Sequence, residues 1–85
     1  MRYYIDTTEM KWTHQDHTEQ LFVKMHIGEK LYDTINQPGH HMVLLRSSSQ
    51  TLPSDIYKRV DVYVDIDDDK RAMMFALAFP KVQVV

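Results

Sequence analysis

The most regular alternation of hydrophobic and polar residues lies between residues 60 and 66. One set of alternate positions is entirely β-branched and apolar: Val60, Val62, Val64 and Ile66. The positions between them are Asp61, Tyr63 and Asp65. Successive side chains of a strand point to opposite faces, so this pattern predicts a strand with one face in the core. We therefore expect Val62 and Val64 to be buried, and Asp61 and Asp65 to be exposed on the opposite face.

Shorter apolar runs predict the rest of a small sheet. Aromatic and β-branched residues between polar ones predict three further strands, over residues 2–6, 41–46 and 81–85. The mostly polar segment 7–17 is interpreted as a connection that Trp12 packs against the domain. Serine-rich residues 47–50 have the composition of a loop.

Residues 18–36 fit two structures, and the fold depends on which one forms. At helical spacing most large apolar side chains share one broad face, made of Leu21, Phe22, Met25, Gly28, Leu31, Tyr32 and Ile35. The opposite face would carry Glu19, His26, Lys30 and Asp33. The alternative is a hairpin, because residues 21–27 also alternate and Gly28-Glu29 could form a tight turn. We favour the helix, although Gly28 in its middle would cost about 1 kcal/mol.

Residues 71–79 are ambiguous in the same way. Their alanines, methionines and leucine favour a helix, which the acidic residues 67–69 are well placed to cap. The alternative is a short turn followed by an antiparallel strand. The two helices together give the order β-α-β-β-α-β, which predicts an α+β domain with a ferredoxin-like arrangement. The two strands instead give a small, mostly antiparallel β domain.

Composition narrows the class of protein. The chain has 85 residues, of which 44% are hydrophobic and 26% charged, as expected for a single globular domain over residues 1–85. It contains no cysteine, which excludes disulfides and thiolate metal sites and fits a reducing compartment. Its first residues already resemble a strand rather than a leader, and the apolar stretch 72–80 is too short for a membrane span. We expect a soluble cytoplasmic protein.

The sequence carries no pattern for nucleophilic or phosphate chemistry. There is no Gly-x-Ser-x-Gly motif, and two glycines are too few for a phosphate-binding loop. Residues 65–69 resemble the start of a calcium loop, but Lys70 and Ala76 occupy the positions that require Gly and Glu. We therefore predict no catalytic residue, no metal site and no cofactor, and consider an enzyme improbable.

Two weaker metal hypotheses remain open. Asp6 and Asp65, on neighbouring predicted strands, could share a magnesium ion with a substrate phosphate, as in a divalent-metal-dependent nuclease. Histidine supplies the ligands of many zinc sites, and the candidates here are His14, His17, His40 and His41.

Exposed aromatic residues support a binding function. Tyr63 lies between two outward aspartates, and Tyr4 is expected on a neighbouring strand of the same face. Tyrosine and arginine are enriched at interfaces, so we predict that Tyr4 and Tyr63 contact a protein partner or a second copy of the chain, with Arg2 and Arg46 at the rim. An adaptor, inhibitor or regulatory subunit fits this prediction, as does a phage-type accessory protein that binds a host factor.

The main alternative is an RNA- or DNA-binding domain. Sheets of this type bind single strands through aromatic stacking and basic side chains. The residues available for this are Arg2, Tyr4, Arg46, Lys58, Arg59 and Tyr63. Asp6, Asp61 and Asp65 are expected on the same face and would repel phosphates. If the weakly charged residues 82–85 form an edge strand, they could also add a strand from a partner.

Overall fold

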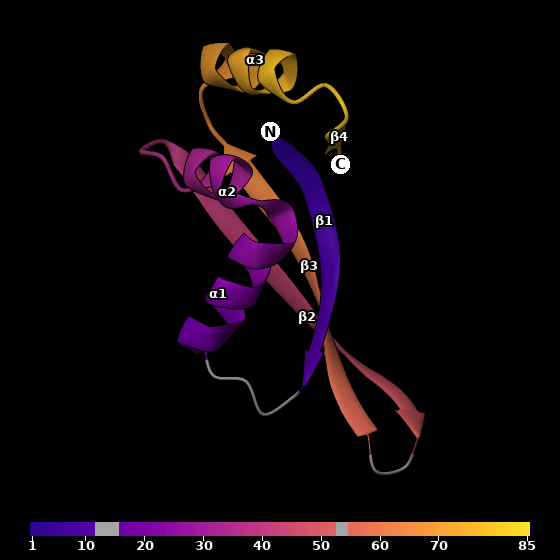
Figure 1. The fold of residues 1–85 in the computed structure, drawn as a ribbon. Helices are drawn as coiled ribbons and strands as arrows, with labels where there is room; N and C mark the ends of the chain where they lie inside the picture. Colours follow the sequence, from indigo (N-terminus) through magenta and orange to yellow (C-terminus); the bar gives the residue numbers. More distant parts are fainter. Residues whose placement is uncertain (12–15, 53–54) are drawn as a thin grey trace.

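A four-stranded antiparallel sheet and three helices form a small α+β domain (Figure 1). The computed structural model describes residues 1–11, 16–52 and 55–85. In chain order the elements are β1 (Arg2–Lys11), α1 (Asp16–Ile27), α2 (Glu29–Ile35), β2 (His40–Leu52), β3 (Asp55–Ile66), α3 (Asp69–Ala78) and β4 (Gln83–Val84). The strands are ordered β2-β3-β1-β4 across the sheet. The predicted connection residue Trp12 lies outside the described residues.

The strands β2 and β3 are much longer than predicted. They pair over most of their length, from His40 opposite Ile66 to Leu52 opposite Asp55. Residues 47–50, which we expected to form a loop, therefore belong to β2. Serine has a low intrinsic preference for strands, but in β2 each of these residues is paired with a residue of β3, and this tertiary context overrides composition.

Strand β1 is also longer than predicted, and β4 is shorter. β1 continues to Lys11 because it pairs with β3 after an irregularity between Tyr4 and Asp6. The extra residue at this bulge, Ile5, packs against the core. The predicted C-terminal strand is reduced to the two residues of β4, which lie at the edge of the sheet beside β1.

Residues 18–36 are helical, as favoured, but they form two helices rather than one. α1 ends where the Gly28 amide donates to the Lys24 carbonyl at 2.9 Å, and the Gly28 carbonyl accepts from the Tyr32 amide at 3.0 Å within α2. Gly28 itself has φ 92° and ψ 150°, outside the helical region. Glycine adopts such a backbone without steric cost, and the prediction of an unbroken helix was wrong at this residue.

The face that α1 buries is also not the one predicted. Its buried residues are Glu19 and Val23, whereas Leu21 and Met25 are 55% and 73% exposed. The part of the sheet beneath α1 presents Lys58, which pairs with Glu19. An inward carboxylate can pair with the buried Lys58 ammonium, whereas an inward leucine would leave that ion pair unformed.

The segment that follows β3 forms the helix that we favoured. Asp68 caps α3, with its carboxylate accepting from the Lys70 amide at 2.8 Å and the Arg71 amide at 3.2 Å. Phe79 ends the helix immediately before Pro80. Among the described residues, no helix has both the length and the apolar character needed to cross a membrane.

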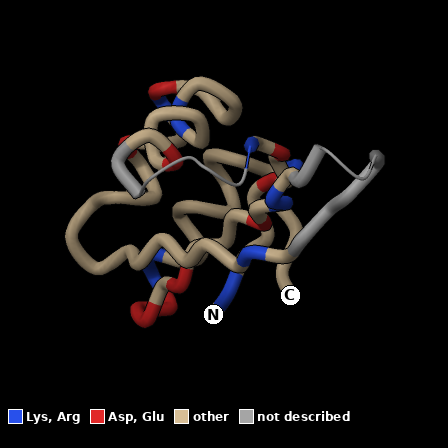
Figure 2. The backbone as a smooth tube through the Cα atoms, turned by 90° about the horizontal axis from the view of Figure 1, so that it is seen from below, with Lys and Arg blue, Asp and Glu red and all other residues tan. Residues whose placement is uncertain are grey.

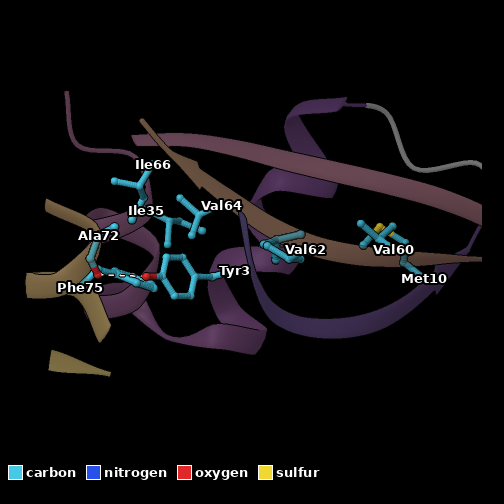
Figure 3. Packing of buried hydrophobic residues seen from close by; sticks show 10 residues of the cluster. Tyr3, Met10, Ile35, Val60, Val62, Val64, Ile66, Ala72 and Phe75 are labelled. Atoms are coloured by element: carbon cyan, nitrogen blue, oxygen red, sulfur yellow. Dashed lines mark hydrogen bonds between the residues drawn. The ribbon is translucent and has the colours of Figure 1, made fainter. Parts of the chain in front are cut away.

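The core lies between one face of the sheet and the helices (Figure 3). Its buried members come from five elements and are Tyr3, Met10, Val23, Ile35, Val60, Val62, Val64, Ile66, Ala72 and Phe75. The Tyr3 hydroxyl donates to the Ala72 carbonyl at 3.1 Å, which ties β1 to α3. The predicted burial of Val62 and Val64 is confirmed, and Asp61 and Asp65 lie on the opposite face with partly exposed side chains.

Candidate interaction surface

The face of the sheet that points away from the helices is the candidate site, and we call it the open face. Helices α1, α2 and α3 all lie on the core side, and no other element of the described chain covers the open face (Figure 1). Strand register and alternation assign its side chains, which include Arg2, Tyr4, Thr7, Glu9, Lys11, His41, Val43, Leu45, Ser47, Tyr57, Arg59, Asp61, Tyr63, Asp65 and Gln83.

Two tyrosines lie on the two inner strands of the open face. Tyr4 and Tyr63 are directly opposite each other on β1 and β3. Their ring centroids are 5.6 Å apart with an interplanar angle of 61°, an edge-to-face arrangement that suits aromatic quadrupoles. The predicted juxtaposition of these tyrosines is therefore present in the structure. Both rings are only partly buried, so a partner could still cover them.

An ion pair holds one side of the tyrosine pair. Arg2 Nε and Nη2 donate to the two carboxylate oxygens of Asp65 at 2.7 and 2.9 Å. The Arg2 guanidinium carbon also lies 5.8 Å from the Tyr63 ring centroid. The hydrogen bonds from Arg2 lower the pKa of Asp65, and the same contact raises the pKa of Arg2. Arg2 thus lies beside the tyrosine pair, with its charge paired by Asp65.

A chain of polar contacts lies on the other side of the tyrosine pair. The Tyr4 hydroxyl is hydrogen-bonded to the Thr7 hydroxyl, which in turn donates to Asp61. Arg59 Nε donates to the same Asp61 oxygen at 3.3 Å. The open face is therefore preorganised around its tyrosines, and the charges of Arg59 and Asp61 offset each other.

Arg46 and Lys58, both proposed as binding residues, lie on the other face of the sheet. Arg46 donates from Nε and Nη2 to the carboxylate of Glu19, and Lys58 Nζ lies 2.7 Å from Glu19 Oε2. Glu19 is fully buried, and its pKa is lowered chiefly by the hydrogen bonds from Arg46, against the opposing effect of burial. The placement of Arg46 at the rim of the tyrosines was therefore wrong.

The sequence contained part of the signal for this buried cluster. Lys58 continues the alternation of Val60, Val62 and Val64, so extending that pattern by one step would have placed it on the core face. For Arg46 no such signal exists, because the residues before it in β2, Met42 to Leu45, are apolar on both faces.

The pairing register of β1 and β3 contradicts the magnesium hypothesis. Asp65 faces Arg2 on the open face, whereas Asp6 lies opposite Val62 and contacts His26 of α1 at 3.2 Å. The bulge in β1 changes the face of Asp6, which the sequence pattern did not reveal.

The histidines are also dispersed. His40 and His41 are adjacent in β2 and point to opposite faces. The side chains of His14 and His17 lie outside the described residues. Within the described part of the chain, no group of three or more His, Asp or Glu side chains is arranged to hold a metal ion.

Sequence reasoning missed a cavity at the other end of the molecule. It has a volume of about 470 Å³ and lies between the end of α2, His40 and α3. Its walls come from segments more than 25 residues apart in the chain, so periodicity alone could not have indicated it.

Comparison with protein-family models, with curated proteins and with solved structures finds no match to this chain.

Proposed function

We propose that this chain is a protein-interaction module whose partner docks on the open face around Tyr4 and Tyr63. The observation that carries the proposal is the partly exposed pair of tyrosines on the two inner strands of the sheet. Tyrosine loses little conformational entropy on binding, and it supplies both apolar area and a hydroxyl. Val43 and Leu45, beside Tyr63 and Asp61 in β2, add apolar surface to the same patch.

Charge favours a protein over a nucleic acid as the occupant. Arg2 and Arg59 are each paired with an aspartate of the open face, so their charges are offset before any ligand arrives. Lys58 and Arg46 face Glu19 on the other side. Lys and Arg positions lie near Asp or Glu positions in several parts of the chain (Figure 2). A phosphate backbone requires an excess of positive charge, which this face lacks.

The wider proposal is that the chain is an adaptor, inhibitor or regulatory subunit in the cytoplasm. The absence of cysteine supports this location, because it fits a reducing compartment. A ferredoxin-like arrangement is part of the same proposal. It is supported by the chain order of strands and helices and by the position of β3 between β1 and β2.

Affinity measurements on Tyr63 variants test the proposal. A protein captured from the native cell by the wild-type chain would be purified and titrated against wild type, Tyr63→Ala and Tyr63→Phe. We expect Tyr63→Ala to raise the Kd by about 5- to 150-fold, corresponding to about 1–3 kcal/mol, and Tyr63→Phe to bind nearly as wild type. Leu77→Ala is the control, because Leu77 is an exposed apolar residue of α3, away from the open face, and is 77% exposed.

Two outcomes would contradict the proposal. Unchanged affinity of Tyr63→Ala for the captured protein would exclude the tyrosine pair as the contact. A salt-sensitive complex with labelled single-stranded RNA, weakened by Tyr63→Ala, would instead support the nucleic-acid alternative. Sedimentation of the isolated chain distinguishes a second copy from a different protein as the occupant.

A further inference from the structure

The cavity beside α3 combines an apolar wall with a basic rim. The wall contains Phe75, which is only 3% exposed, and Met74. The rim contains Lys70 and Arg71 from the start of α3, together with His40 at the start of β2. A volume of about 470 Å³ falls within the range of about 300–1,000 Å³ that is usual for small-molecule sites. We propose that this cavity binds a small amphipathic carboxylate, a monoanion with a flat apolar body.

The apolar wall is held in place by aromatic packing. The Phe75 ring lies 5.2 Å from Tyr3 and 5.3 Å from Phe79, measured between centroids. His40 presents its ring at 84° to Phe75 with a centroid separation of 6.1 Å. Three neighbouring rings therefore fix the orientation of Phe75, and an apolar ligand would meet a preformed surface.

The rim carries one unit of net positive charge apart from His40. Asp68 also lines the cavity, but its carboxylate already accepts from the Lys70 and Arg71 amides as the cap of α3. Arg71 Nη1 donates to the Pro38 carbonyl at 3.0 Å, which fixes the guanidinium beside the cavity. The Lys70 ammonium has no ion-pair partner among the residues that the structure describes. The sum of Lys70, Arg71 and Asp68 matches a monoanion better than a highly charged phosphate ester.

The ring of His40 offers a polar contact as well. Its Nδ1 lies 2.7 Å from the Thr34 carbonyl oxygen, which can only accept, so Nδ1 carries the proton in this contact. This tautomer leaves Nε2 of the neutral ring as a hydrogen-bond acceptor. A hydroxyl or amide on the body of the ligand could donate to it, which would add orientation to the charge contact at Lys70.

Titration with 2-naphthoate, followed by amide chemical shifts, tests the inference on the whole chain. The neutral 2-naphthamide has the same apolar body and serves as the ligand control. Two pairs of variants isolate the cavity. Lys70→Gln removes a rim charge, whereas Lys81→Gln removes the same charge outside the cavity. Met74→Gln alters the wall, whereas Met73→Gln alters an adjacent methionine that is equally exposed, 60% against 61%, and does not line the cavity.

We expect saturable binding of 2-naphthoate, with shifts centred on His40, Arg71 and Phe75. The Kd should rise at least fivefold in Lys70→Gln and in Met74→Gln and stay within twofold of wild type in Lys81→Gln and Met73→Gln. The amide 2-naphthamide should bind at least fivefold more weakly than the acid. Absence of saturable binding overturns the inference, as do equal effects of the two lysine variants or equal affinity for acid and amide.

Discussion

At the scale of single residues, Glu19 has the least ordinary environment. It is a fully buried carboxylate beneath α1, held by Arg46 and by the nearly buried Lys58. Desolvating these charges is costly, and direct hydrogen bonds between the groups offset the cost. Removing the Glu19 charge would break both ion pairs at once, so we interpret the cluster as a structural element of the fold.

Glu19→Gln should therefore be strongly destabilising. We expect the free energy of unfolding to fall by about 3 kcal/mol in urea titrations at pH 7, because the change removes the buried negative charge that pairs with both Arg46 and Lys58. Glu9→Gln, on the exposed side of β1, should change it by less than about 0.5 kcal/mol. A loss at position 19 no larger than at position 9 would contradict the account of the cluster.

Acidification tests the same ion pairs without a mutation. The pKa of Glu19 is lower in the folded chain than its ordinary value, so its contribution to stability is complete above the unfolded pKa of about 4.3. That contribution is lost as pH falls through the folded pKa. The stability difference between wild type and Glu19→Gln should accordingly be constant from pH 7 to about pH 5 and narrow below about pH 4. A difference that widens on acidification would contradict the lowered pKa.

At the scale of elements, Gly28 decides how the segment between β1 and β2 folds. Its φ and ψ angles lie outside the helical region, so α1 and α2 can meet the sheet at different angles (Figure 1). A single helix would run straight on from α1 instead. The hydrophobic pattern predicted a helix here, but the periodicity of side chains does not reveal that Gly28 has a positive φ.

Gly28→Ala is expected to destabilise the domain by about 1–3 kcal/mol, since L-residues rarely adopt φ 92° with ψ 150°. Steric contact is not the cause, because a Cβ at this position would meet no atom within 4 Å. D-Alanine, introduced by chemical synthesis, has the same side chain and tolerates positive φ, so it should be close to neutral. Chemical denaturation of the three proteins decides the matter: a stabilising L-alanine would indicate one continuous helix.

The elements also show which face assignments could be predicted from the sequence. The alternation in β3 predicted the core valines, and the same alternation placed Tyr63 beside Tyr4 on the open face. The face of Asp6 was not predictable, because a one-residue bulge changes every face assignment after it. The face of Arg46 was not predictable either, because residues 42–45 are all apolar and give no period. In α1, Glu19 is buried because it pairs with Lys58 of the sheet, so the buried face does not follow the apolar periodicity.

At the scale of the whole molecule, the two faces of the sheet have different roles. One face carries the helices, the core and the Glu19 cluster, while the other presents Tyr4 and Tyr63 among paired charges. The molecule measures 47 × 22 × 18 Å, and its long dimension reflects β2 and β3, which extend together beyond the helices (Figure 1). A partner can therefore approach the open face without displacing any element of the described chain.

Cross-saturation from a bound partner tests the location of the interface most directly. The isotope-labelled chain would be mixed with the protein it captures, and the partner's protons would be saturated while amide signals of the chain are recorded. The account predicts signal loss at Tyr4, Val43 and Tyr63, with Val23 and Leu77 on the helical side unaffected. Signal loss confined to α1, α3 or the β4 edge, with Tyr4 and Tyr63 unchanged, would contradict it.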